Sequence, residues 1–558
     1  MEEYSNIEAF IDVLNANGVE NVFFNPGIDN VPMLETIAKY RASGEPSPRS
    51  ILCLDEFVAM TAAHGNYMVT GKPQVVSVHS ELGALQVGGS LHNAQWGKVP
   101  VVLYTESLGP PRRTDWRGDP FEQGIMARNF VKWDHQIADD ENISDVFNEA
   151  FRIAITEPYG PVYLTLQRKD LWSTSDSQPV GKKVKPATTQ LPEPDENTLR
   201  QAADILLAAE SPLIITGHSG RNLETPALLV QLAEMLAARV QSSDIRMNFP
   251  NTHPLSVRIA PSFGRTSPAL TAADVILIID YDMPYAAPAV APNLVAKIIH
   301  IDIDFAKKGV PLWDRHPDIA VMGDSVRVIS LLIDILNEKI TSERRQQLQQ
   351  RSRKIEAEHT RISKEWRALA SKQSGNRPIT ANWLSYCIDT VIDEDTVIVN
   401  QTISPSMIVA HQVHRSRPGT LLSCAGGCIG WAPGAALGAK LALPDKTVIS
   451  LMGDGAFIYG CPEASLWSAG FYKAPYLAII FNNSGYGAIK GLFRENYDVE
   501  NMGADIPTPP DYALIAQACN AYGRTVEEPS EVVPALKEAL DRVRDGQPAV
   551  LNVKLEPV

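Results

Sequence analysis

The sequence predicts an α/β protein made of three doubly wound parallel-sheet domains. Short β-branched apolar runs alternate with spacers of helical length along the chain, a pattern typical of parallel sheets covered by helices on both faces. The chain has 558 residues, which is too many for one hydrophobic core and corresponds to about three or four domains. Together these two observations favour several α/β units in a row.

The expected strands fall into three groups. The first comprises NVFFN, VVSV, VPVVLYTE and PVYLTL, the second PLIITG, VILIID and KIIHIDID, and the third TVIVNQ, TVISLMGDG, YLAIIFNN and AVLNVKL. A linker-like stretch rich in Ser, Thr, Pro and Lys at 173–196 separates the first two groups, and a charged stretch typical of a solvated connecting helix separates the last two at 338–376. We therefore expect domains at 1–175, 195–340 and 376–558, of which the first and third could share one layout.

Charge and composition restrict the partners of the protein. Lys and Arg total 50 against 65 Asp and Glu, and the net charge of −15 disfavours nucleic acid or an anionic membrane surface as a partner. The N-terminus lacks the basic start and apolar run of a secretory signal, and no stretch approaches the roughly 18 apolar residues of a membrane span. The six cysteines form no Cys-x-x-Cys pair, which favours a cytoplasmic location over a zinc site or a disulfide framework.

Oxygen-bearing side chains follow two expected strands of the third domain. The run TVISLM ends at Gly453-Asp454-Gly455, and the run YLAIIF ends at Asn482-Asn483, followed by Ser484-Gly485-Tyr486. Open α/β sheets bind ligands at the carboxyl ends of their strands, so both segments should meet at one edge. A helix is expected to begin near Pro462, because proline suits the first helical turn.

This set of groups fits Mg²⁺ bound to a diphosphate. Mg²⁺ requires octahedral oxygen ligation and usually takes few protein groups beside phosphate oxygens and water. The carboxylate of Asp454, the amide oxygen of Asn483 and the backbone carbonyl of Gly485 would supply the protein's share. The glycines let the backbone approach phosphate closely, and free N–H groups at the start of the next helix favour an anion.

The Gly-Asp-Gly and Asn-Asn segments are similar to the thiamine-diphosphate signature. The wider stretch from Cys424-Ala-Gly-Gly-Cys-Ile-Gly-Trp431 to Asn482-Asn-Ser-Gly-Tyr-Gly-Ala-Ile489 resembles the thiamine-diphosphate-dependent decarboxylase–carboligase family, which includes benzoylformate decarboxylase, acetolactate synthase, pyruvate oxidase and benzaldehyde lyase. The resemblance covers essentially the whole chain and implies pyrimidine-binding, central and diphosphate-binding domains, in that order. One departure is a slightly longer connection before the second strand, near Tyr472-Lys473. The implied cofactor contacts in this region are Gly453, Asp454, Gly455, Ala456, Asn483, Gly485 and Tyr486.

The resemblance also implies contacts outside the metal site. Glu56, at a strand end that runs into a helix, matches the glutamate that bonds the N1′ atom of the cofactor and promotes its activation. Ile429 would support the bent cofactor, and Gly427 would accept from its 4′-amino group. Ser404 would donate to the diphosphate. The structural alternatives are a helix-dipole glutamate, a core isoleucine and a surface Ser-Pro turn.

Two further residues are candidates for contact with substrate. His79, in Val-Val-Ser-Val-His-Ser before a glycine-bearing turn, resembles the catalytic histidine of benzoylformate decarboxylase, although a lone histidine is often structural. That enzyme follows its Asn-Pro-Gly turn with a serine that holds the substrate carboxylate, whereas Asn25-Pro26-Gly27 precedes Ile28, which cannot donate. Gln123 is a candidate for the glutamine that acetolactate synthases and benzaldehyde lyases place near the thiazolium.

The central domain and one loop suggest two weaker possibilities. The segment Gly217-His-Ser-Gly220-Arg221 contains a Gly-x-x-Gly, which is weak support for a nucleotide, although related enzymes bind FAD or ADP in this domain. FAD is therefore possible but not favoured. The loop after the expected strand VPVVLYTE carries Arg112, Arg113 and Arg117, which indicate either a solvated loop or a lid that recognises a carboxylate.

These features predict thiamine-diphosphate-dependent cleavage or formation of a carbon–carbon bond in a 2-keto acid or 2-hydroxy ketone. The first expectation is non-oxidative decarboxylation with possible acyloin carboligation. The alternatives are an acetolactate-synthase-like carboligase, a lyase or hydrolase acting on a diketone and, remotely, a non-catalytic cofactor-binding paralogue. The resemblance implies a homodimer or homotetramer in which Glu56 and Asp454 of different chains reach one cofactor. The expected partner is a small carbonyl substrate, with no nucleic acid and no membrane.

Overall fold

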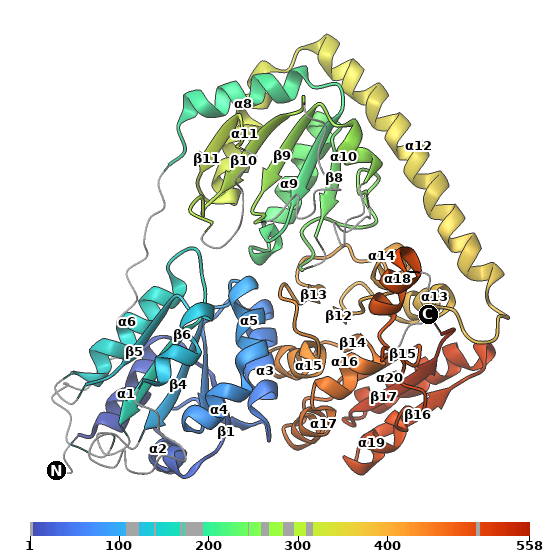
Figure 1. The fold of residues 1–558 in the computed structure, drawn as a ribbon. Coiled ribbons are helices and arrows are strands. Elements are labelled where there is room, and N and C mark those ends of the chain that lie inside the picture. Colours follow the sequence, from blue (N-terminus) through green and yellow to red (C-terminus); the bar gives the residue numbers. More distant parts are fainter. Residues whose placement is uncertain are drawn as a thin grey trace.

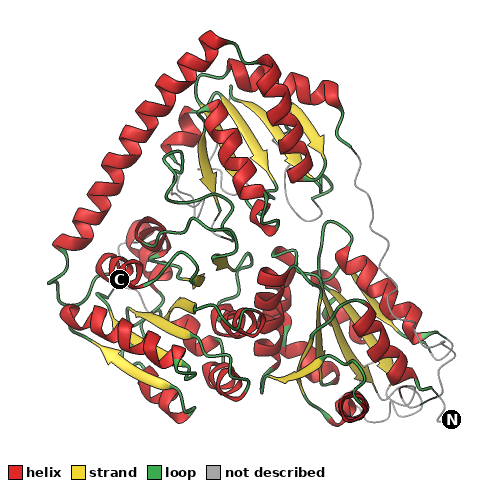
Figure 2. Cartoon of the chain, turned by 180° about the vertical axis from the view of Figure 1, so that it is seen from behind, coloured by secondary structure: helices red, strands yellow, loops and turns green. Residues whose placement is uncertain are grey.

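Three parallel β-sheets, each accompanied by helices on both faces, form separate parts of the molecule (Figures 1 and 2). The predicted α/β fold class is therefore confirmed. This computed structural model describes residues 4–107, 122–138, 141–167, 171, 173, 193–243, 245–257, 267–282, 295–307, 316–497 and 503–557. The arginine cluster at 112–117 and most of the expected linker at 173–196 lie outside those ranges. Within them, no helix has the length and apolarity needed to cross a membrane.

The first sheet has six parallel strands in the order β2-β1-β3-β4-β6-β5. Its strands are β1 (Asn21–Asn25), β2 (Arg49–Leu52), β3 (Gln74–Val78), β4 (Val101–Ser107), β5 (Trp133–Gln136) and β6 (Val162–Gln167). The main helices of this domain are α1 (Asn6–Ala16), α2 (Val31–Ser43), α3 (Glu56–Thr70), α4 (Ser80–Gln86), α5 (Gly88–Trp96) and α6 (Ile143–Ile155). Strands β3, β4 and β6 are buried along their whole length, because helices cover both faces of the sheet.

The third sheet also has six parallel strands, in the order β13-β12-β14-β15-β17-β16. Its strands are β12 (Val397–Gln401), β13 (Leu421–Ser423), β14 (Val448–Gly453), β15 (Leu477–Asn482), β16 (Tyr522–Val526) and β17 (Ala549–Lys554). The helices are α13 (Ala381–Val391), α14 (Ser406–Gln412), α15 (Trp431–Ala442), α16 (Asp454–Tyr459), α17 (Pro462–Phe471), α18 (Gly487–Asn496), α19 (Tyr512–Ala518) and α20 (Val532–Arg544).

The first and third domains share one layout. Numbered within each domain, both strand orders read 2-1-3-4-6-5, and the second strand leads into α3 in one domain and α15 in the other. In both, the winding of the chain reverses between the first and third strands. Such a switch point is where open α/β sheets bind ligands. The repeated layout therefore marks two equivalent edges, at β1 and β3 in the first domain and at β12 and β14 in the third.

The central domain has a five-stranded parallel sheet and leads into a long helix. The sheet order is β11-β10-β9-β7-β8, with β7 (Pro212–Thr216), β8 (Arg239–Ser242), β9 (Val275–Ile279), β10 (Lys297–Asp302) and β11 (Ile319–Met322). Its helices are α8 (Glu196–Ala208), α9 (Thr225–Leu236), α10 (Pro268–Ala272) and α11 (Ser325–Lys339). Helix α12 (Ser342–Lys372) then runs along one side of the molecule to the third domain, as the charged stretch predicted (Figure 1).

Helices α3 and α15 join the first domain to the third. Small residues let the two helices approach closely: a Cβ added to Gly434 would lie 1.9 Å from Thr61 Oγ1, and one added to Gly438 would lie 1.8 Å from Ala62 O. One hydrophobic core therefore runs through both domains. The central domain is attached by the segment after β8, where Arg246 forms an antiparallel bridge with Leu422.

Candidate active site

The two predicted ligand segments meet at the carboxyl edge of the third sheet. Strands β14 and β15 are neighbours, with Gly453 in register with Phe481. Asp454 begins α16, and its carboxylate accepts hydrogen bonds from Gly455 N at 2.8 Å and from Gly485 N at 3.0 Å. Direct hydrogen bonds thus hold the ends of the two strands together.

The longer connection before β15 leaves this arrangement intact. Helix α17 begins at Pro462, as predicted, and the chain turns at Lys473, whose φ is +54°, before the strand begins. The Tyr472 hydroxyl accepts from Leu52 N at 2.7 Å and lies 3.2 Å from Ser50 O. The extra length therefore contacts the first domain.

Asp454 is a buried acid at a point suited to a cation. Its side chain is 1% exposed, and burial raises the pKa of its carboxyl, while backbone N–H donors such as Gly455 and Gly485 oppose the rise. Each carboxylate oxygen retains lone pairs after accepting one hydrogen bond. A divalent cation bound there would offset the free-energy cost of burying the negative charge.

Ser404 and Asn483 converge beside the same edge. Ser404 lies just before α14 and Asn483 directly follows β15, and both line a cleft of about 350 Å³. A Cβ added to Gly487, at the start of α18, would lie 2.5 Å from Ser404 Oγ and 2.8 Å from Asn483 Nδ2. A hydroxyl and an amide from two strand ends are therefore close together, as a diphosphate and its metal would require.

Open glycines at this edge leave room for a bound group. A Cβ added to Gly453 or to Gly427 would meet no atom within 4 Å. Gly455 differs, because its Cβ would lie 2.7 Å from the Tyr486 ring, so that glycine permits close packing. Free space beside a buried carboxylate and an amide fits thiamine diphosphate with Mg²⁺. Among the described residues, no three or more His, Cys, Asp or Glu side chains are grouped to hold a metal ion, so phosphate and water oxygens would complete the ligation.

The loop that carries Gly427 and Ile429 is held by the first domain. Asn93 Nδ2 donates to Cys428 O at 2.8 Å, and Asn93 Oδ1 accepts from Cys428 N at 3.1 Å. Gln401 Nε2 donates to the same carbonyl at 3.2 Å. Ile429 is half-buried against the shared core. Sequence reasoning missed Asn93, because nothing near it in the sequence indicates a partner more than 300 residues away.

Glu56 is the first residue of α3 and is half-buried. Cys461 lies nearby in the third domain, where burial, followed by the charge of Asp55, raises the pKa of its thiol to about 12, and Glu56 contributes to the same shift. The Phe57 and Tyr459 rings also meet edge to face, with centroids 5.7 Å apart. The start of α3 is therefore next to the elements that follow β14.

His79 lies at the equivalent edge of the first sheet. It directly follows β3 and is the N-cap residue of α4, so the glycine-bearing segment after it is helical and the predicted turn is wrong. Its side chain is 42% exposed, and its Nδ1 lies 2.6 Å from the buried Asp29 Oδ1. Sequence reasoning missed Asp29, whose one signal is its position two residues after Gly27.

Gln123 lies inside the first domain. It is 1% exposed, and its Oε1 accepts hydrogen bonds from Thr105 Oγ1 at 2.9 Å and from Tyr163 OH at 3.3 Å. Its side-chain oxygen therefore holds two strands of the first sheet together. A role for Gln123 beside the cofactor stays a prediction.

The central Gly-x-x-Gly differs from an open phosphate-binding loop. A Cβ added to Gly217 would lie 2.3 Å from the Tyr281 ring, and one added to Gly220 would lie 2.6 Å from Met247 O. Both glycines therefore pack against protein. Among the described residues, the loop after β7 does not form a cradle that fits the phosphates of FAD.

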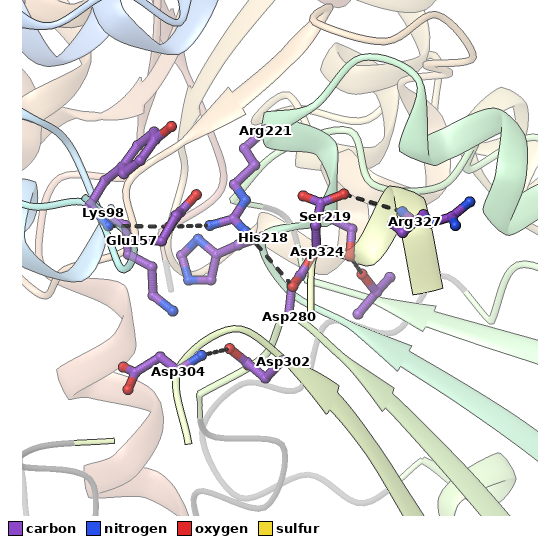
Figure 3. Close-up of polar contacts among 12 residues, drawn as sticks. Lys98, Glu157, His218, Ser219, Arg221, Asp280, Asp302, Asp304, Asp324 and Arg327 are labelled. Carbon is purple, nitrogen blue, oxygen red and sulfur yellow. Dashed lines mark hydrogen bonds and ion pairs between the residues drawn. The ribbon is translucent and has the colours of Figure 1, made fainter. Parts of the chain in front are cut away.

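Charged side chains of the first and central domains meet beside this loop (Figure 3). Arg221 Nη1 donates to Glu157 at 3.0 Å, and Arg221 Nη2 lies 4.0 Å from Asp280 Oδ1. His218, from the same loop, is fully buried, and burial followed by the charge of Lys98 holds its pKa at about 3. The imidazole is therefore neutral near neutral pH.

A second set of ion pairs joins the ends of β9 and β10. Lys307 Nζ donates to Asp282 and to Asp302 at 2.6 Å each, and Lys98 from the first domain donates to Asp282 at 2.9 Å. Burial alone would raise the pKa of Asp302, but neighbouring donors and cations, among them Lys98 and Lys307, lower it overall. This edge is therefore neutralised by the protein's own side chains.

Three family signatures match the chain in order. Residues 6–117 match the N-terminal TPP binding domain of thiamine pyrophosphate enzymes, 199–332 the central domain and 404–553 the C-terminal TPP binding domain. A benzoylformate decarboxylase of Pseudomonas aeruginosa is 26% identical, covering 98% of this chain and 99% of that enzyme. A probable acetolactate synthase large subunit of Methanococcus aeolicus is 27% identical, covering 99% and 92%. The solved structure of a 4-hydroxybenzoylformate decarboxylase of Rhodococcus jostii shares the fold, with a TM-score of 0.81, 23% identity and 99% of each chain covered.

Proposed function

Because the chain belongs to the thiamine pyrophosphate enzyme family, we propose that it cleaves or forms a carbon–carbon bond beside the carbonyl of a 2-keto acid or 2-hydroxy ketone, with thiamine diphosphate and Mg²⁺. The observation that carries this proposal is the meeting of Asp454 and Asn483 on neighbouring strand ends, beside the open Gly453.

Residues of the third domain would hold the cofactor. Asp454, Asn483 and the carbonyl of Gly485 bind the metal, and Ser404 donates to the diphosphate. Gly427 and Ile429 position the rings, supported by the bonds from Asn93 and Gln401 to Cys428. When bound, thiamine diphosphate supplies a nucleophilic carbon that adds to a carbonyl and stores the electrons of the broken bond.

Two residues of the first domain would move protons. Glu56 bonds the N1′ atom of the cofactor and shares its proton, which requires a carboxyl next to the pyrimidine edge. His79 gives a proton to the substrate or removes one, through the exposed side of its ring. Ile28, which is 73% exposed close to His79, offers an apolar surface where a serine would bind a carboxylate.

The relatives are named as decarboxylases and acetolactate synthases, and these names correspond to two classes of reaction. A decarboxylase needs one keto acid, whereas an acetolactate-synthase-like carboligase, the second candidate, needs a second carbonyl acceptor. Cleavage or hydrolysis of a diketone is a further possibility, because Ile28 suits a substrate without a carboxylate at that point. A non-catalytic paralogue would need the metal site but not Glu56. FAD is not part of the proposal.

A second copy of the chain would cover the two switch-point edges. Large exposed apolar residues follow the strand ends of both outer domains: Ile28, Leu54, Leu82 and Leu85 in the first domain, and Ile403, Ile458, Tyr459, Ile489 and Leu492 in the third. Where such residues form a contiguous patch, they normally mark an interface. A homodimer or homotetramer with Glu56 and Asp454 of different chains at one cofactor accounts for it. The cytoplasmic location stays a prediction.

The direct test is a panel of 2-keto acids and 2-hydroxy ketones, offered singly and in pairs with thiamine diphosphate and Mg²⁺. Release of CO₂ and identification of carbonyl products separate decarboxylation, carboligation and C–C cleavage. Glu56→Gln should lower turnover by about 10²-fold or more while the protein still binds the cofactor, because only the proton-sharing carboxyl is lost. Unchanged turnover in Glu56→Gln would remove that residue from the mechanism.

Mixing two inactive variants tests the shared site. In a hybrid of Glu56→Gln and Asp454→Asn chains, one site carries both substitutions and the other carries neither. Randomly exchanged dimers should therefore regain roughly a quarter of wild-type turnover. No recovery after verified subunit exchange would place both residues in one chain's site.

A further inference from the structure

We propose that Asp29 is a positioning residue that orients His79 and keeps its Nε2 free of a proton. This inference rests on the proposed function, since it concerns how His79 acts there. The geometry is that of a hydrogen-bonded Asp–His pair at the switch point of the first sheet, where the loop after β1 meets the end of β3.

Asp29 has two fixed donors. His79 Nδ1 lies 2.6 Å from Asp29 Oδ1, and Ser80 N donates to Asp29 Oδ2 at 3.1 Å. Because the carboxylate accepts on both oxygens, the proton of the neutral imidazole belongs on Nδ1. The opposite nitrogen, Nε2, is then an acceptor. The Asp29 side chain is 7% exposed whereas that of His79 is 42% exposed, so the imidazole is the part of the pair that reaches the surface.

The loop that carries Asp29 is shaped around the histidine ring. A Cβ added to Gly27 would lie 2.0 Å from His79 Nδ1 and 2.2 Å from Asp29 Oδ1, so any other residue would displace the pair. Asn30 fastens the loop: its Oδ1 accepts from Gly27 N at 2.8 Å, and its Nδ2 donates to Ser77 Oγ at 2.6 Å. The ring is thus held by contacts on the side away from Nε2.

The equivalent edge of the third domain supports a catalytic role, rather than a purely structural one, for the Asp29–His79 pair. There the first and third strands of the domain lead to Ser404 and Asp454, the proposed cofactor ligands. In the first domain the same two strands lead to Asp29 and His79. One switch point offers a hydroxyl and a carboxylate beside open space, and the other offers a single oriented base.

Asp29→Asn tests the orientation, because the backbone fixes which way the amide turns. Ser80 N–H requires an acceptor, so the amide oxygen faces Ser80 and the NH₂ group faces His79 Nδ1. Nδ1 then becomes the acceptor, and Nε2 carries the proton. We expect kcat to fall about 10- to 100-fold with KM within about twofold, and cofactor affinity to stay the same. Gly27→Ala should lower kcat in the same way while it leaves the carboxylate in place.

A double-mutant cycle of Asp29→Asn and His79→Ala separates a positioning role of Asp29 from general damage to the structure. If Asp29 acts through His79, Asp29→Asn should not lower kcat further in the His79→Ala background. An equal loss in both backgrounds would overturn the proposal, as would wild-type kcat in Asp29→Asn. If the wild-type protein neither binds thiamine diphosphate nor acts on any carbonyl substrate, the proposed function fails instead.

The state of the His79 ring nitrogens can also be measured without any substrate. Diethyl pyrocarbonate acylates the unprotonated ring nitrogen, and mass spectrometry of peptides reports each histidine separately. At one fixed pH, modification of His79 should be several-fold slower in Asp29→Asn than in wild type, relative to the exposed His316 in the same digest. An equal rate, or an unreactive His79 in the wild-type protein, would contradict a free and accessible Nε2.

The chain offers a matched control. Asp389 accepts from His414 N at 2.7 Å and lies 3.0 Å from His414 Nδ1, where α13 meets the segment after α14, and Arg367 also donates to this carboxylate. Asp389→Asn should leave kcat unchanged, because this Asp–His pair lies outside the proposed site. A similar fall in kcat would show that loss of any such pair disturbs the enzyme.

Discussion

The carboxyl edges of the third and central sheets differ in the free space and in the cations that surround their buried acids. At the third, Asp454 is buried beside Gly453, where an added Cβ would meet no atom within 4 Å. At the central one, Tyr281 and Met247 fill the space beside Gly217 and Gly220, and Lys98 and Lys307 together already pair with Asp282 and Asp302. Both edges combine glycines with acids after parallel strands. Only the third of these two edges keeps free space beside a carboxylate with no cation partner, which is what the proposed metal and diphosphate require.

The largest expected effect comes from neutralising the acid of the third edge. In Asp454→Asn, the amide cannot balance a divalent cation, and its NH₂ group faces the N–H of Gly455 or Gly485. We expect thiamine diphosphate affinity in the presence of Mg²⁺ to fall about 100-fold or more, measured by calorimetry. The exposed Asp445→Asn, in the turn before β14, is the control and should bind normally. Equal affinities in the two variants would show that the third edge does not hold the metal.

A substitution at the central edge should lower the free energy of unfolding rather than the affinity for the cofactor. Lys307→Met leaves two buried carboxylates without their main cation, and we expect the free energy of unfolding to fall by about 3 kcal/mol or more. Urea unfolding of the cofactor-free protein measures this change. Lys297→Met, in the same domain, removes a lysine whose pair with Asp318 is largely exposed, and should cost about 1 kcal/mol at most. Equal costs would mean that the central ion pairs are not a structural network.

A smaller effect is expected from the hydroxyl beside the third edge. Ser404→Ala removes one hydrogen bond to a charged diphosphate, which corresponds to an affinity loss of about tenfold. Ser406→Ala, two residues further on, should bind as wild type. Titration of each variant with thiamine diphosphate at saturating Mg²⁺ gives both values, and a wild-type affinity for Ser404→Ala would remove Ser404 from the site.

A further effect concerns the pH dependence of the central edge. Burial and Lys98 hold the pKa of His218 at about 3, below its ordinary value of 6.5, so the unfolded chain takes up a proton that the folded chain does not. The stabilisation is complete above pH 6.5 and is lost as the pH falls towards 3. Between these values the wild-type protein should lose about 1.4 kcal/mol per pH unit more than His218→Gln. Urea unfolding between pH 6.5 and 4.5 measures both slopes, and parallel slopes would contradict a neutral buried imidazole.

The strands that could be predicted from sequence are the interior ones. Every apolar run singled out in the sequence became a strand with two neighbours in its sheet, from β1 to β17. Of the six edge strands, the sequence indicated only the end of β2, before Glu56. Edge strands such as β5, with WDHQ only partly buried throughout, lack the continuous apolar run because just one neighbour and part of one face cover them.

The proposed site could be predicted where its residues directly follow a strand end. Asp454 and Asn483 could be placed together because parallel strands bring their carboxyl ends to one edge. Asn93 and Asp29 could not, because their roles come from contacts with Cys428 and His79, which are distant in sequence. The burial of Gln123 could not be predicted either, since its partners Thr105 and Tyr163 lie on β4 and β6, away from it in the sequence.

The central claim is that the ends of β14 and β15 hold a divalent cation on a diphosphate. It is tested most directly by calorimetric titration of metal-stripped protein with thiamine diphosphate, with and without Mg²⁺. We expect saturable binding of one cofactor per chain with Mg²⁺ and a loss of about 100-fold or more in affinity without it. Binding that is equally tight without any divalent cation, or no binding in either condition, would contradict it.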